Sequence, residues 1–265
     1  MEKQRIVEEQ HLAFVYQKLV TRQQALRLFL DKGYASHLQD LQAIGSDIRL
    51  NFDNLSDSLE TYAAIESKNR EIDQMNLSLQ SAEKELATIE RLLKSPYFGK
   101  IAVDFLDGEA AESFYIGING FADEDSQNLI YDWRSPIAEL FYNNTLGASS
   151  YQVNDQRIPV SIENRRQLIV DQDQLLRFFD TSVAIQDEVL LTALEKNDGK
   201  KMRDITASIQ REQNAVIRDQ SSQALLVNGV AGSGKTSVIM QRVAYLFYNY
   251  RIKVTSVNVL ILSAN

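Results

Sequence analysis

Cysteine is absent from this 265-residue chain, and proline and histidine are scarce, with three and two copies. The lack of cysteine excludes disulfide bonds, thiolate metal sites and cysteine nucleophiles, and it is typical of a reducing compartment. No apolar run approaches the roughly 18 residues that a membrane span needs. The charged first ten residues also lack the apolar core of a secretory signal. We therefore predict a cytoplasmic protein that makes no membrane contact.

Positive charge is also in short supply. The chain has 28 Lys and Arg against 36 Asp and Glu, a formal net charge of −8. Duplex affinity comes mostly from basic side chains that neutralise phosphates, so such an acidic chain is a poor general binder of nucleic acid. Nucleic-acid binding would need a local basic groove or residues absent from this chain. An acidic chain is equally suited to a basic protein surface.

The first 95 residues contain no proline, and only Gly33 and Gly45 could interrupt a helix there. We predict two long helices, separated by a break near residues 45–53. Each helix carries residues at alternating spacings of three and four, which is typical of the apolar seam of a coiled coil. The seam positions are Leu12, Val15, Leu19, Arg22, Leu26 and Phe29 in the first helix, and Ile72, Met75, Leu79, Ala82, Leu86, Ile89 and Leu93 in the second. Residues 1–95 are therefore predicted to form an antiparallel coiled-coil hairpin, with arms on the order of 60 Å long at 1.5 Å per residue.

The expected far end of this hairpin is acidic. The acids are Asp40, Asp47, Asp53, Asp57, Glu60, Glu66, Glu71 and Asp73, and the bases are Arg49, Lys68 and Arg70. The local net charge is therefore −5. One interpretation is a solvated helix face, which is what most charged runs are. The other is an acidic tip that enters a basic or metal-containing site on a partner.

The residue pattern of the sequence changes after Ser95-Pro96, where proline is expected to end the second helix. Short runs rich in Val, Ile, Tyr and Phe are separated by turn-forming residues, a pattern that predicts a small, mainly antiparallel β module over residues 96–172. The predicted strands are residues 100–106, 113–118, 128–133, 137–142, 151–153, 158–160 and 167–170. We expect Tyr131 and Trp133 to belong to the core of this module and Arg134 to pair with an acid inside it. Helices are predicted over residues 174–197 and 204–219.

The region 173–265 ends in a β-loop-α-β pattern, in which residues 224–228 and 257–262 are predicted buried strands and residues 236–248 a helix. The loop between the first strand and the helix reads Gly229-Val230-Ala231-Gly232-Ser233-Gly234-Lys235-Thr236. A parallel sheet of two strands cannot bury both of its faces, so we expect the natural protein to continue beyond Asn265.

This loop fits the phosphate-binding pattern Gly-x-x-x-x-Gly-Lys-Thr. Its glycines let successive backbone N–H groups point at phosphate oxygens, and the helix that follows adds positive potential at its N-terminus. Lys235 is expected to reach the β- and γ-phosphates, and the Thr236 hydroxyl to bind Mg²⁺. The alternative is a chance glycine-rich turn.

Two segments of the chain resemble motifs of UvrD/Rep-type superfamily 1 helicases. Gly229 to Ser237, followed by Gln241-Arg242-Val243-Ala244-Tyr245-Leu246, is similar to their first motif. Residues 209–218 are similar to their Q-motif, in which Gln213 takes the position of the glutamine that reads adenine. The last residues, 261–265, resemble the start of the next motif, which contacts single-stranded DNA in that family. Arg242 has two interpretations, a structural salt bridge or support of the nucleotide pocket.

This resemblance implies the start of a RecA-like P-loop α/β domain that uses ATP and Mg²⁺. Lys235 would be its catalytic residue and Thr236 its metal ligand. The implied nucleotide-binding residues are Gln213, Gly229, Val230, Ala231, Gly232, Ser233, Gly234, Lys235, Thr236 and Ser237. Hydrolysis also needs a second acid for Mg²⁺ and a base for the water, which no strand of this chain carries. We therefore expect an ATPase as the full-length protein and no activity from this chain alone.

The upstream region narrows the resemblance to HelD-type proteins, which are helicase-like ATPases that associate with bacterial RNA polymerase. The similar segments are residues 97–101, 115–118 and 130–137, the last of which reads Ile-Tyr-Asp-Trp-Arg-Ser-Pro-Ile, together with Phe141-Tyr142. In that family the N-terminal coiled coil enters the polymerase secondary channel, and the ATPase domains help to release nucleic acid and recycle stalled polymerase. The resemblance implies core RNA polymerase as the partner, with DNA or RNA reached through parts absent from this chain.

Taken together, the sequence predicts an α+β multi-domain chain with a coiled-coil hairpin, a small β module and the start of a P-loop domain. Two other functions stay open. One is an ATP-dependent DNA helicase or repair translocase of the UvrD/Rep class, although such enzymes begin close to the Q-motif and this chain has about 200 residues before it. The other is an interaction module with a vestigial P-loop.

Overall fold

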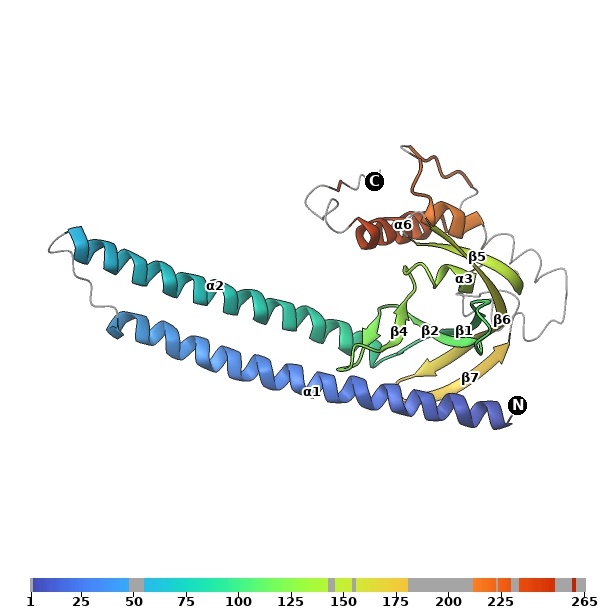
Figure 1. Cartoon of the computed structure of the whole chain (residues 1–265), viewed down its shortest axis with the longest axis horizontal. Helices are drawn as coiled ribbons and strands as arrows, with labels where there is room; N and C mark the ends of the chain where they lie inside the picture. Colours follow the sequence, from blue (N-terminus) through green and yellow to red (C-terminus); the bar gives the residue numbers. More distant parts are fainter. Residues whose placement is uncertain are drawn as a thin grey trace. The chain divides into compact units, whose positions relative to one another are not determined.

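The computed structural model describes residues 2–47, 55–142, 146–153, 156–180, 212–222, 224–229, 234–250 and 259–260. The chain divides into two compact units. The first consists of Met1–Pro96 with Val170–Leu176, and the second of Tyr97–Ile169 with Arg177–Asn265. The first unit is mainly helical and the second contains most of a mixed sheet, so the predicted α+β class is confirmed (Figure 1).

The first unit is built on two long helices, α1 (Glu2–Asp47) and α2 (Leu55–Leu92), which we call the arm. The two helices run side by side in opposite directions (Figure 1). Aliphatic side chains are buried between them, because the regular spacing keeps these residues on one face of each helix. The buried residues are Leu12, Val15, Leu19, Leu26 and Leu30 of α1, and Leu79, Ala82, Ile89 and Leu92 of α2.

The predicted seam is displaced by one residue near one end of each helix. In α1, Phe29 is 44% exposed and Leu30 is buried instead. A straight helix with 3.6 residues per turn drifts from a strict heptad by about 20° per repeat, which moves the buried position onward. In α2, Leu92 is fully buried and Leu93 only half-buried. This end of α2 also meets residues 170–176, where the Gln172 N–H donates to the Lys94 carbonyl at 2.8 Å.

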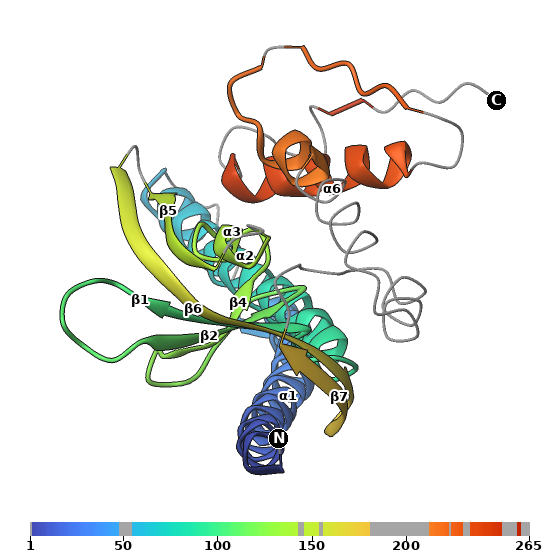
Figure 2. The same ribbon diagram turned by 90° about the vertical axis from the view of Figure 1, so that its right-hand side faces the viewer.

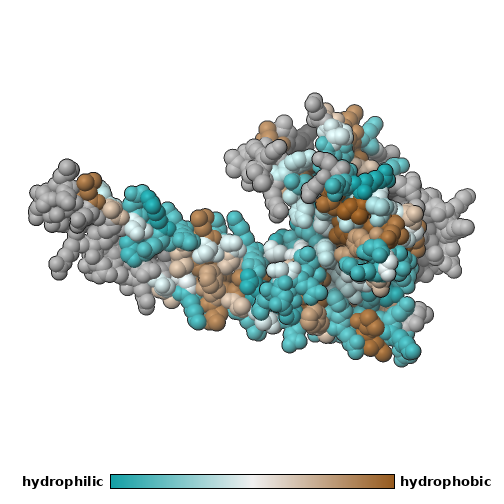
Figure 3. Space-filling view, viewed as in Figure 1, coloured by the Kyte–Doolittle hydropathy of each residue, from teal (hydrophilic) through white to brown (hydrophobic). Residues whose placement is uncertain are grey.

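Ion pairs flank the seam. The guanidinium of Arg22, which was predicted as a seam position, donates to both carboxylate oxygens of Glu85 at 2.6 and 2.9 Å. Arg27 likewise donates to Glu90 at 2.9 Å. The visible face of the arm is largely hydrophilic, with separate hydrophobic spots (Figure 3). Among the described residues, no helix is both long and apolar enough to pass through a bilayer.

The described residues of the β module form a seven-stranded sheet in the order β3-β4-β2-β1-β6-β5, with β7 also paired to β6 (Figure 2). Its strands are β1 (Gly99–Asp104), β2 (Glu112–Gly117), β3 (Phe121–Ala122), β4 (Asn128–Asp132), β5 (Gly147–Val153), β6 (Gln156–Asp171) and β7 (Gln174–Asp180). β1 pairs with β2 and β6 in antiparallel fashion, as do β3 with β4 and β5 with β6, whereas β2 and β4 are parallel. The sheet is therefore mixed rather than purely antiparallel.

Residues 137–142 do not form the predicted strand. Successive i→i+3 hydrogen bonds begin at the turn that ends in Pro136 and lead into the short helix α3 (Glu139–Tyr142). Proline cannot donate to a strand ladder. A short apolar run can also be buried in either conformation, so its periodicity does not distinguish them. The prediction of a strand here was wrong for that reason.

The helix predicted from residue 174 onward was also wrong in its first residues. Gln172 turns the chain with a φ of 53°, and β7 returns beside β6. Arg166 of β6 donates to both carboxylate oxygens of Asp180 at 2.6 and 3.0 Å, and its guanidinium lies 4.9 Å from the Phe178 ring. These cross-strand contacts stabilise the hairpin. The rest of this predicted helix, residues 181–197, lies outside the described residues, as do residues 204–211 of the next one.

One close packing contact explains a glycine of the sequence motif at residues 97–101. A Cβ on Gly99 would lie 2.3 Å from the Phe141 ring, so only glycine lets β1 approach α3. Below α3, Arg165 is 1% exposed and donates to the Leu140 carbonyl at 3.0 Å. Burial lowers the pKa of Arg165 to about 10, which leaves it charged at neutral pH. The core of the β module is thus sealed by α3 on one face of the sheet.

Candidate nucleotide-binding site

Two helices of the second unit carry the residues that the sequence assigns to a nucleotide. Residues 212–218 form one of them, and α6 (Lys235–Asn249) is the other. They share a small core of Ile217, Val238 and Tyr245, which are 6%, 7% and 6% exposed. The helix of Gln213 and the helix that follows the phosphate loop are therefore neighbours.

Arg242 ties these two helices together. Its guanidinium donates to the Val216 carbonyl at 2.5 Å and lies 3.6 Å from the Asp219 carboxylate. Asp219 also accepts the Ser221 N–H at 3.0 Å and the Ser221 hydroxyl at 2.8 Å. Of the two interpretations of Arg242, the structure bears out the salt bridge.

Gly234 adopts a conformation at the start of α6 that explains why this position is glycine. It is the N-cap residue, with φ 79° and ψ 13°, in the left-handed region. An added Cβ would meet nothing within 4 Å, so the backbone angle, not space, favours glycine. Among the described residues, no side chain caps this end of α6, so the N–H groups of its first turn remain available to an acceptor from outside the helix. This arrangement fits an anionic group such as a phosphate.

Lys235 joins the two ends of the predicted phosphate loop. Its ammonium donates to the Gly229 carbonyl at 2.8 Å. Thr236 and Ser237 follow in the first turn of α6, and both are exposed. The remaining predicted loop residues, Val230, Ala231, Gly232 and Ser233, lie outside the described residues.

The strand predicted before the loop is not formed. Residues 224–228 have no strand structure, and Leu225 and Leu226 are 41% and 92% exposed. A strand exists only through hydrogen bonds to a neighbouring strand, and no described strand pairs with this segment. Residues 259–260, within the second predicted strand, are likewise not in a strand, and Leu260 is 81% exposed. The rest of that prediction lies outside the described residues.

Gln213 is half-buried on the helix of residues 212–218. Helical spacing places it on the same face as Ile217, which contacts α6. In the part of the chain that the structure describes, no three Asp, Glu or His side chains gather as a metal site.

Comparison with known families divides the chain in two. A family model described as DNA helicase IV HelD, N-terminal domain, matches residues 6–199. The chain belongs to the HelD family. A second model, the UvrD/REP helicase N-terminal domain, matches residues 209–264. A search of curated proteins returned no match.

The structure also identifies a junction between these two family regions that the sequence motifs did not reveal. It is centred on the turn after β4, where Asp132 accepts the Arg134 N–H at 2.8 Å and pairs with its guanidinium at 2.5 Å. The predicted pairing of Arg134 with an acid is therefore confirmed. The same guanidinium lies 4.9 Å from the Tyr248 ring of α6. Tyr248 of α6 thus contacts this turn.

Trp133 has two roles at this junction. Its half-buried ring packs against the core of the β module, as predicted, and also against the cluster of Ile217, Val238 and Tyr245. Its carbonyl accepts a hydrogen bond from Arg218 at 2.6 Å. The unusual Trp-Arg-Ser-Pro sequence of the HelD region was the available signal, but it marked family membership and not this contact.

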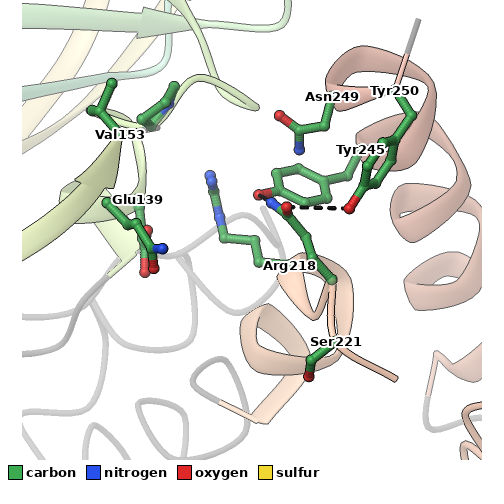
Figure 4. A pocket seen from close by; sticks show the side chains of 10 residues that line it. Glu139, Val153, Arg218, Ser221, Tyr245, Asn249 and Tyr250 are labelled. Carbon is green, nitrogen blue, oxygen red and sulfur yellow. Dashed lines mark hydrogen bonds between the residues drawn. The ribbon is translucent and has the colours of Figure 1, made fainter. Parts of the chain in front are cut away.

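A cavity of about 720 Å³ lies beside the junction (Figure 4). Glu139 and Val153 line it from the β module, and Arg218, Tyr245 and Tyr250 from the other side. Gln220 links the two tyrosines, donating to the Tyr245 hydroxyl at 2.9 Å and accepting from Tyr250 at 3.3 Å. Of the loop residues that the structure describes, Gly229, Gly234, Lys235 and Thr236 do not line this cavity.

Proposed function

We propose that this chain is the N-terminal part of an ATP-dependent, helicase-like factor that binds bacterial core RNA polymerase and helps to release or recycle it. The observation that carries the proposal is a HelD-family chain in which Lys235 closes a phosphate-binding loop onto Gly229. The UvrD/REP match over residues 209–264 supports helicase-like ATP chemistry. Residues 1–95, 96–172 and 173–265 are proposed as its three parts.

The loop and α6 would hold the triphosphate of ATP. Backbone N–H groups at the start of α6 would bind phosphate oxygens, and the Lys235 ammonium would exchange the Gly229 carbonyl for the β- and γ-phosphates. The Thr236 hydroxyl would be a ligand of Mg²⁺, which neutralises phosphate charge. Gln213 would read the adenine edge from the neighbouring helix.

The arm would be the polymerase-binding part, as a coiled-coil hairpin with an acidic tip. Its antiparallel helices and buried aliphatic seam support this proposal. Glu66, Glu71 and Asp73 are exposed on the part of α2 that approaches the tip. Acidic side chains on a two-helix arm suit a basic channel, because such charges steer association.

A charge reversal tests the arm. We expect Glu66→Lys/Glu71→Lys/Asp73→Lys to weaken binding of the full-length protein to core RNA polymerase by more than about tenfold, because opposite charges become like charges. The control, Glu109→Lys/Glu124→Lys/Asp125→Lys, makes the same change in net charge at exposed acids of the β module. Affinity is measured by equilibrium titration of fluorescent polymerase. Equal loss in both triple variants would refute a specific role of the arm.

A second experiment tests the phosphate loop. In the full-length protein, Lys235→Ala should abolish ATP hydrolysis, whereas Lys84→Ala on the exposed surface of α2 should not change it. Equal rates for the parent and Lys235→Ala would favour the vestigial P-loop. We expect no measurable hydrolysis from this chain alone.

A DNA helicase or repair translocase is the second candidate function, and the UvrD/REP family match favours it. A strand-displacement assay separates the two functions. ATP-driven unwinding of a tailed duplex by the full-length protein without polymerase would support the translocase. The proposed polymerase factor requires polymerase binding that the arm variant weakens.

A further inference from the structure

Arg218 contacts three structural elements of the second unit at once. Its guanidinium donates to Asn214 on its own helix at 3.1 Å and to the Trp133 carbonyl of the β module at 2.6 Å. The same group lies 5.6 Å from the Tyr142 ring of α3 and 5.2 Å from the Tyr245 ring of α6. Arg218 thus connects the HelD region, residues 6–199, to the UvrD/REP region, residues 209–264.

These contacts use properties that are specific to arginine. The flat guanidinium can lie near two aromatic rings while its edge donates to a carbonyl, and a lysine ammonium can reproduce the donation but not the stacking. The hydrogen bond is also directional, so it restrains the rotation of the helix of residues 212–218 more than apolar contact alone would. Ile217, on the adjacent position, provides the apolar part of the same contact.

Gln213 lies on this helix, one turn before Ile217. Over the helical residues that the structure describes, 212–218, a restraint at the last turn sets the orientation of the preceding turn, because the backbone hydrogen bonds keep the turns in register. A change at Trp133 or Arg218 therefore changes where Gln213 can place its amide. Lys235 begins α6, and the contact of Arg218 with that helix is at Tyr245, ten positions further along. Arg134 also holds α6 near the same end, through Tyr248.

We propose that Arg218 is a positioning residue that fixes Gln213 relative to the β module and thereby sets the preference of the site for adenine. This inference rests on the proposed ATP-binding function. The β module then contributes structurally to recognition of the base. The start of α6 is ten residues from the Tyr245 contact, and Arg134 also holds this helix, so loss of Arg218 weakens selection of the base more than binding of the phosphates.

The test compares the dissociation constants of ATP and GTP for the full-length protein, measured by calorimetry. Arg218→Gln is expected to weaken ATP binding by about tenfold, the size of a lost charged hydrogen bond, and GTP binding by less than about twofold. Arg218→Lys, which keeps a donor for Trp133 without the stacking, should show a smaller loss of ATP preference. If Arg218→Gln does not fold, Arg218→Lys is used for the same comparison of ATP and GTP binding.

Arg134→Gln is the matched control, because Arg134 is also a junction arginine over a tyrosine of α6. Its contacts within the described residues are with Asp132, Trp133 and Tyr248, and not with the helix of Gln213. Its ratio of GTP to ATP dissociation constants should equal that of the parent. An unchanged ratio in both Arg218 variants, or an equal loss of ATP and GTP binding, would overturn the role of Arg218. A parent that binds neither nucleotide would instead overturn the proposed function, and a parent without adenine preference would overturn the assignment of Gln213 and this inference.

Discussion

The arm and the candidate nucleotide-binding segment, which consists of residues 212–218 and α6, are stabilised by different kinds of contact. Between α1 and α2, most buried side chains are aliphatic, and charged residues such as Arg22 remain partly exposed beside the seam. In the candidate nucleotide-binding segment the buried cluster is small. Arg218 donates to the Trp133 carbonyl of the β module, and Arg242 donates to the Val216 carbonyl of the neighbouring helix. Apolar burial supplies stability without direction, whereas hydrogen bonds to carbonyls fix orientation. The first suits an extended support and the second suits a site whose geometry matters.

The largest effect is expected for a substitution in the buried aliphatic seam of the arm. Leu19→Ala should lower the free energy of unfolding of the arm by about 3 kcal/mol, because Leu19 is fully buried and its removal leaves a cavity. Chemical denaturation followed by circular dichroism measures this change. The control, Leu28→Ala, alters a side chain that is 55% exposed and should cost less than about 0.5 kcal/mol. Similar costs for both leucines would contradict the observed seam.

A backbone change tests the nucleotide-binding segment. Gly234→Val should destabilise the start of α6 by about 1–2 kcal/mol, because a β-branched residue is strained at a φ of 79°. Gly234→Asn should cost less, since asparagine tolerates this region. Thermal unfolding and nucleotide binding are measured on all three proteins. If valine and asparagine were equally tolerated, the left-handed conformation of residue 234 would be wrong.

An ion pair of the arm tests how much charge contributes to the stability of this region. The coupling energy between Arg22 and Glu85 should be below about 1 kcal/mol, because both side chains are about 40% exposed and water screens the charges. A double-mutant cycle with Arg22→Ala and Glu85→Ala, repeated at low and high salt, measures this energy. A larger, salt-independent value would show that charge contributes to the arm as strongly as the aliphatic seam does.

The smallest expected change concerns pH at the nucleotide-binding segment. Hydrogen bonds from the Ser222 and Ser221 hydroxyls and from the Ser221 N–H hold the pKa of Asp219 well below its usual range. A depressed folded-state pKa gives stability that is present above the unfolded value and lost only as pH falls through the folded value. The destabilisation by Asp219→Asn should therefore stay constant from about pH 8 to about pH 5. The difference should then shrink as pH falls from about 4 to about 2, because the unfolded carboxylate takes up a proton there and the folded one does not. A difference that stays constant over that lower range as well would show an ordinary pKa.

Sequence patterns predicted elements wherever local spacing is enough to define an element. The arm helices, the burial of Leu12, Val15 and Leu19, and the helical state of residues 212–218 follow from helical periodicity and from the lack of proline. The β content of residues 99–171 follows from short β-branched and aromatic runs between turn residues. These features depend on neighbours a few positions away, so one sequence contains the information.

Predictions failed where the choice depended on distant partners. Residues 174–180 pair as β7 because Arg166, Asn164 and neighbouring residues of β6 offer cross-strand contacts to Asp180. Residues 137–142 become α3 because a helical turn fits Leu140 and Phe141 over the sheet. Residues 224–228 were expected to be buried, yet no described strand pairs with them.

By itself, the sequence determined the two arm helices, the phosphate-loop pattern with Gly234 and Lys235, and the family of the chain. Only the tertiary structure decided that Arg218 donates to the Trp133 carbonyl, 85 positions away, and that Arg134 lies over Tyr248. The physical reason is that periodicity and turn preferences are local, whereas a contact between a side chain and a distant carbonyl exists only once the elements carrying them have packed.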